Sequence, residues 1–81
     1  MTANSLHRAR GIIRVVTQAT SGERNRALFW AAMRARHMLL AGEINKTDGA
    51  ELLRILHREA ISGGLPAREA ERTIKSAMRP A

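Results

Sequence analysis

The sequence contains no cysteine and no tyrosine, and its 81 residues include only one phenylalanine, one tryptophan and two prolines. Without cysteine, the chain can form neither a disulfide framework nor a thiolate metal site. No apolar run approaches the roughly 18 residues that a membrane span needs. The stretch from Met1 to Gly11 is polar and basic, with no apolar signal core. We therefore expect a cytoplasmic protein with no membrane partner.

The residue patterns that support catalysis or metal binding are also missing. His7, His37 and His57 are far apart in the sequence and have no carboxylate at the spacing of a metal partner. The chain has no glycine-rich phosphate loop and no serine–histidine–acid arrangement, and its acids are scattered. We therefore expect a protein that is not an enzyme, with no catalytic residue, no metal and no cofactor.

The chain does contain four apolar patterns at helical spacing, separated by breaks that contain glycine. They predict a small all-α fold with one domain over 1–81 and helices over about 5–19, 25–41, 48–62 and 66–78. Polar residues that can cap the first three helices precede them, namely Asn4 or Ser5, then Asn25, then Thr47 or Asp48. Gly42 follows the second helix, where a left-handed residue is expected.

The predicted second helix has an apolar stripe that is interrupted by one arginine. The stripe consists of Leu28, Phe29, Ala32, Ala35, Leu39 and Leu40. Arg36 projects from the same side, within about 20–40° of the centre of the stripe. Its charged head therefore has to reach water, pair with an acid or contact a partner.

Positive charge is concentrated in the first half of the chain. Residues 1–42 carry seven arginines and one acid, Glu23, whereas residues 43–81 carry seven basic residues and six acids. The net charge is thus +6 in the first part and +1 in the second. Because like charges repel and cost stability, this asymmetry favours an anionic partner, and nucleic acid is the first candidate.

The second helix also carries an aromatic residue among cations. Arg26, Trp30, Arg34 and His37 lie within about 80° of one another around the helix axis. An indole between two guanidinium groups can stack on a base while the arginines hold its phosphates. The alternative is that Trp30 is a boundary residue packed against the first or fourth helix, with the arginines extending over it.

The fourth helix presents a row of cations that can follow a phosphate backbone. The row consists of Arg68, Arg72, Lys75 and Arg79. Its alternative interpretation is a solvated surface, partly neutralised by neighbouring acids. The third and fourth helices also have the lengths of a helix-turn-helix, in which the reading helix would begin at Pro66. Three arginines from the first half complete the candidate nucleic-acid-binding set: Arg10, Arg14 and Arg24.

Two groups of residues resemble a known family. They are Gly22-Glu23-Arg24-Asn25 with Leu28, Ala31-Ala32 and Ala41-Gly42, and Gly64-Leu65 with Glu69-Ala70 and Arg72-Thr73-Ile74-Lys75-Ser76. Together they resemble the C-terminal helical accessory domain of the bifunctional primase–polymerases of actinobacteria, their phages and their plasmids. The resemblance covers roughly residues 5–79. It implies a helical module that handles nucleic acid without catalysis, because the paired aspartates of the catalytic core are absent.

The sequence departs from that family pattern in the predicted second helix. Arg36 stands where a small residue is common, and Phe29 and Trp30 replace polar residues. The leading hypothesis is a non-catalytic nucleic-acid-binding module, with DNA ahead of RNA, linked to replication of a phage, prophage or plasmid. The alternative is a small phage or plasmid regulator that binds a replication or transcription protein through Phe29, Trp30, Met33 and Met38. A homodimer that buries the second helix is a third possibility.

Overall fold

The structure is a computed structural model that describes residues 1–80, and this part of the chain is entirely helical apart from its connections. It contains α1 (Ala3–Thr17), α2 (Arg24–Leu40), α3 (Lys46–Ser62) and α4 (Ala67–Met78). The predicted all-α fold of four helices is confirmed, and each helix begins and ends within two residues of the expected position. No helix in residues 1–80 is long and apolar enough to cross a membrane.

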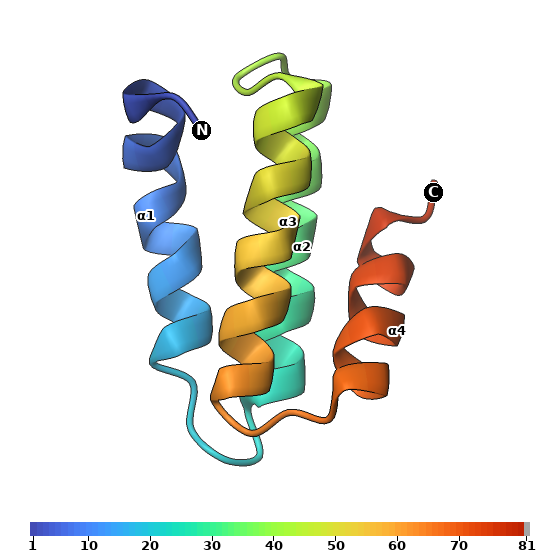
Figure 1. The fold of residues 1–81 in the computed structure, drawn as a ribbon. Coiled ribbons are helices and arrows are strands. Elements are labelled where there is room, and N and C mark those ends of the chain that lie inside the picture. Colours follow the sequence, from blue (N-terminus) through green and yellow to red (C-terminus); the bar gives the residue numbers. More distant parts are fainter. Residues whose placement is uncertain (81) are drawn as a thin grey trace.

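Helices α2 and α3 form a central antiparallel pair, with α1 on one side of the pair and α4 on the other (Figure 1). Both α1 and α4 pack against α2 and α3, but within residues 1–80 they do not contact each other. The backbone measures 32 × 27 × 15 Å. The surface of α2 that faces away from α3 is therefore bordered by α1 along one side and by α4 along the other.

The core consists of aliphatic side chains from all four helices. Leu28, Leu52 and Leu56 are its largest fully buried members. Each such side chain contributes about 1.5–3 kcal/mol by leaving water. On α2, Ala31 and Ala35 are fully buried beside Leu28, and their small size lets the other helices approach this helix closely.

Glycines end α2 and α3 as the pattern predicted. Gly42 has a φ of +74°, and the following Glu43 N–H donates to the carbonyl of Met38 at 2.9 Å. Gly64 has a φ of +114°, and the Leu65 N–H donates to the carbonyl of Ala60 at 3.0 Å. Both are left-handed C-terminal motifs that satisfy the last carbonyls of a helix. They set the positions at which the chain turns into the next helix.

The predicted N-caps of α1 and α3 are wrong. Thr2 caps α1, because its Oγ1 accepts a hydrogen bond from the backbone N–H of Ser5 at 3.1 Å. Asn45 caps α3, because its Oδ1 accepts from the backbone N–H of Asp48 at 2.7 Å. In both cases the capping residue lies two or three residues before the expected position, so each helix begins earlier than predicted.

Asn25 does not cap α2 either. It is the second residue of the helix, after Glu23, which occupies the N-cap position without a side-chain hydrogen bond. The Asn25 Nδ2 instead donates to the Thr73 Oγ1 at 2.7 Å. A residue expected to make a local contact therefore joins α2 to α4.

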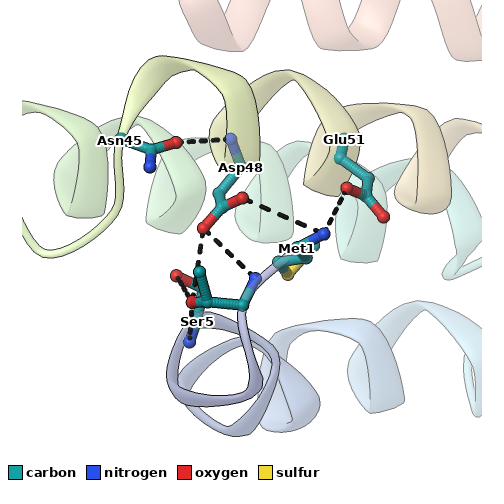
Figure 2. Close-up of polar contacts among 6 residues, drawn as sticks. Met1, Ser5, Asn45, Asp48 and Glu51 are labelled. Carbon is teal, nitrogen blue, oxygen red and sulfur yellow. Dashed lines mark hydrogen bonds and ion pairs between the residues drawn. The ribbon is translucent and has the colours of Figure 1, made fainter.

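A polar cluster ties the beginning of α1 to the beginning of α3 (Figure 2). The Met1 ammonium lies 2.7 Å from a carboxylate oxygen of Glu51 and 4.0 Å from one of the buried Asp48. A hydrogen bond from Ser5, and others from Thr2, lower the pKa of Asp48. The hydrogen bond to Glu51 raises the pKa of the Met1 ammonium. Both charged forms are therefore favoured in the folded chain.

The apolar stripe of α2 is rotated by about 65° around the helix from its predicted centre. Ala31 and Met38 are buried against the other helices, whereas Phe29 and Leu40 are 42% and 71% exposed. The prediction was wrong for these two residues, because α2 turns its side toward α1 as well as α3. The same rotation moves Arg36 to the edge of the stripe, where it is half-buried and has no carboxylate within 4.0 Å in residues 1–80.

Candidate nucleic-acid interface

The side of α2 that points away from α3 carries aromatic and basic side chains together. We define this outer face of α2 as Arg26, Phe29, Trp30, Met33, His37 and Leu40, all of which are exposed except the half-buried Met33. These positions fall within about 100° around the axis. Trp30 is 46% exposed, so it lies at the boundary and is not sealed in the core.

One hollow lies between α1 and α2, beside Trp30. This Trp30 hollow has a volume of ≈ 470 Å³. It is lined by Arg8, Gly11, Ile12, Trp30, Arg34, Met38 and Glu43. Gly11 contributes no side chain at the α1 wall, and a Cβ there would meet nothing within 4 Å. One side of the indole therefore borders an open space with a guanidinium group next to it.

A second hollow lies on the other side of the same helix, between α2 and α4. This Phe29 hollow has a volume of ≈ 370 Å³ and is lined by Asn25, Phe29, Glu69, Arg72, Thr73 and Ser76. The hydrogen bond between Asn25 and Thr73 joins two of its lining residues across the contact between α2 and α4. Because Phe29 and Trp30 are adjacent in the sequence, their side chains diverge by about 100° around α2. The two rings thus border two hollows on opposite sides of one helix.

Carboxylates neutralise only some of the cations around this face. Arg34 and Arg72 have no carboxylate within 4.0 Å in the described part of the chain, whereas Arg26 lies 3.4 Å from Glu23. In the lining of the Trp30 hollow, Arg8 pairs with Glu43 at 3.1 Å. Both pairs are exposed and therefore weak, so a phosphate can compete with the carboxylates for either arginine.

The structure brings four of the ten predicted residues to this surface. They are Arg26, Trp30 and Arg34 of α2 and Arg72 of α4, which lines the Phe29 hollow.

The other six predicted residues lie elsewhere. Arg14 is about 160° around α1 from the buried Ile12 and Val16, so it points away from the bundle, and Arg10 lines neither hollow. Arg24 lies at the beginning of α2 and lines neither of these two hollows, but it lines a neighbouring one that it shares with Asn25 and Glu69. The remaining three are exposed along α4 without lining a hollow: Arg68, Lys75, which pairs with Glu71 at 3.2 Å, and Arg79 just after the helix.

Sequence reasoning missed several residues of this surface. Phe29 was assigned to the core, and Arg8, Asn25 and Glu69 were not recognised as neighbours of the aromatic rings. The adjacent Phe29 and Trp30 were a usable signal, because neighbouring side chains of a helix diverge by about 100°, so two large rings do not fit the centre of one buried stripe. Contacts between α2 and α4 depend on the packing of distant segments, and no local pattern indicates them.

Helices α3 and α4 run in opposite directions as a hairpin (Figure 1). The helix-turn-helix interpretation of this pair stays a prediction. In residues 1–80, no group of three or more histidine, aspartate or glutamate side chains is placed to hold a metal ion. Comparison with known proteins gave no matching family model, no matching curated protein and no matching solved structure.

Proposed function

We propose that this chain is a non-catalytic nucleic-acid-binding module and that the outer face of α2, with its two hollows, is the binding surface. The observation that carries the proposal is the exposure of Phe29 and Trp30 on one helix between Arg34 and Arg72. Exposed aromatic rings stack on bases, and neighbouring arginines hold phosphates. A surface that needed only solubility would not combine two large exposed rings with arginines that form no ion pair among residues 1–80.

The shape of the surface favours binding of an unpaired strand over insertion of α2 into the groove of a duplex. The major groove of B-DNA is about 12 Å wide and admits a single projecting helix. Here α2 is bordered on both sides, and the backbone is 27 Å across in its second-longest direction. An unpaired base can instead turn its face toward a ring in a shallow hollow. We propose single-stranded DNA as the first ligand, with RNA as the comparison.

The association with replication of a phage, prophage or plasmid rests on the resemblance of the chain to the helical accessory domain of primase–polymerases. The residues of that resemblance include Asn25 and Thr73. Their side chains form the hydrogen bond between α2 and α4, and so they have a structural role in placing the two helices. We propose that such a module positions a strand for a separate catalytic protein.

A protein partner is the second candidate, and the apolar content of the same face favours it. Leu40, Phe29 and Trp30 are all exposed, and Met33 lies beside them on α2. Aromatic residues, methionine and arginine are common at the centres of interfaces. Met38 is not one of the anchors, since it is only 5% exposed. The expected partner is an acidic surface of a replication or transcription protein. A second copy of this chain would bring like charges together.

Titration with labelled oligonucleotides separates these functions. We expect a single strand of about 12 nucleotides to bind more tightly than a duplex of the same length, with an affinity that falls as salt rises. A partner captured in stoichiometric amount from a nuclease-treated lysate, together with no binding to either oligonucleotide, would favour the protein-binding function instead. Light scattering on the free protein tests the homodimer.

A further inference from the structure

Among the described residues, Glu69 is the one side-chain carboxylate that forms no ion pair. Every other acid forms an ion pair: Glu23, Glu43, Asp48, Glu51, Glu59 and Glu71. Within residues 1–80, Glu69 has neither an ion pair nor a hydrogen bond to its carboxylate, although the sequence has 14 lysines and arginines. It is half-buried and lines the Phe29 hollow. The first turn of α4 favours a negative charge at this position, but it does not explain why the carboxylate borders a hollow beside an aromatic ring.

The other groups around the Phe29 hollow have complementary roles. Phe29 offers a ring for stacking, and Arg72 offers a guanidinium group that forms no ion pair with any residue of the described part of the chain. The Nδ2 of Asn25 is engaged with Thr73, which leaves the Asn25 Oδ1 as an acceptor. The hollow thus combines an apolar surface, one cation and two groups of hydrogen-bond acceptors. A ligand that fits it has a flat ring, a negative group and hydrogen-bond donors along one edge.

We infer that the Phe29 hollow is a base-selective subsite for an unpaired guanine in a single strand, with Glu69 as the residue that determines the selectivity. Guanine presents two adjacent donors, N1–H and N2–H₂, and these match the two oxygens of a carboxylate. Thymine and uracil offer one N–H between two carbonyls, which a carboxylate repels. Adenine and cytosine place a ring acceptor beside their single amino group.

This inference rests on the proposed function, since it identifies the base that one part of the same surface prefers. Stacking on Phe29 accepts any base, and the phosphate contact of Arg72 carries no sequence information. Selectivity therefore has to come from Glu69, with Asn25 as a supporting acceptor. The subsite requires an unpaired guanine, because the edge that Glu69 reads is occupied by cytosine in a duplex.

The test compares an oligothymidylate of about 12 nucleotides with the same strand carrying one central guanine, by fluorescence anisotropy at constant salt. We expect the guanine strand to bind about five- to tenfold more tightly to the natural protein. In Glu69→Gln this preference is expected to fall below about twofold, because one of the two acceptors becomes a donor. Strands with one central adenine or cytosine are expected to bind like the oligothymidylate.

Glu71→Gln is the matched control. It removes the same charge from the same helix, but Glu71 is exposed, pairs with Lys75 and does not line the hollow. We expect both variants to bind the oligothymidylate slightly more tightly and only Glu69→Gln to lose the guanine preference. Salt-dependent binding without any guanine preference, or a preference that survives in Glu69→Gln, would overturn this inference and leave the proposed function intact. Absence of binding to every strand would overturn the proposed function itself.

Discussion

Replacing Trp30 tests whether its ring is used for stacking. Trp30→Leu keeps an apolar side chain at the boundary between α1 and α2 but removes the aromatic face. Base–aromatic stacking is worth about 1–3 kcal/mol per base. Because Trp30 is 46% exposed, so that only part of the ring is available to a base, we expect the lower half of that range. The dissociation constant for a single strand should then rise about five- to thirtyfold.

The same substitution also affects stability, and the two effects have to be separated. About half of the indole is buried, which corresponds to roughly 100 Å² and about 2.5 kcal/mol for complete truncation. Leucine replaces much of that contact, so the expected loss is about 1 kcal/mol. Circular dichroism in urea measures this loss, and anisotropy of a labelled strand measures binding well below the unfolding transition.

Trp30→Phe is the control, since phenylalanine is smaller than tryptophan but retains an aromatic face. We expect it to bind a single strand within about threefold of the natural protein. If Trp30→Leu binds as tightly as the natural protein, or if the leucine and phenylalanine variants lose affinity equally, then stacking on Trp30 is refuted and the residue serves only as a boundary contact.

Three further predictions concern stability. Leu52→Ala removes a side chain that is 0% exposed and should lower the free energy of unfolding by about 2–5 kcal/mol, measured by urea denaturation. Gly11→Ala, at a helical position where a Cβ meets nothing within 4 Å, should raise it by about 0.5–1 kcal/mol in the same assay. The folded pKa of Asp48 lies below its usual 3.8, so its stabilising charge is fully present above that value and is lost as pH falls through the folded pKa. In thermal melts between about pH 2 and 6, the Tm should therefore fall more steeply with decreasing pH in the natural protein than in Asp48→Asn. Plots of Tm against pH that run parallel for the two proteins would contradict this.

The sequence was sufficient to predict the number, order and approximate extent of the helices. Apolar spacing is a local property, and the glycines that end α2 and α3 act within a single turn. Gly42, for example, adopts the left-handed conformation that its position indicated. The caps were less predictable, because Thr2 and Asn45 compete with several polar neighbours for the same backbone N–H groups.

The candidate surface was predictable only in part. The positions of Arg26, Trp30 and Arg34 on one side of α2 follow from helical geometry alone. Phe29 was misplaced, because the exact direction of the buried stripe depends on how α2 is shared among three neighbouring helices. The role of Glu69 as a lining residue of the Phe29 hollow could not be predicted, since it depends on the packing of α4 against α2.

The measurement that tests the central claim most directly is the salt dependence of single-strand binding in two matched double variants. Contact with about three to five phosphates predicts a slope of log K against log salt of about −2 to −3.5 for the natural protein. The double variant Arg34→Gln/Arg72→Gln changes the arginines beside the two rings. Its slope should be less negative by about 1.4. Arg10→Gln/Arg14→Gln removes the same charge away from the outer face of α2 and should leave the slope nearly unchanged. Equal slopes in the two variants, or binding that does not respond to salt, would contradict the account.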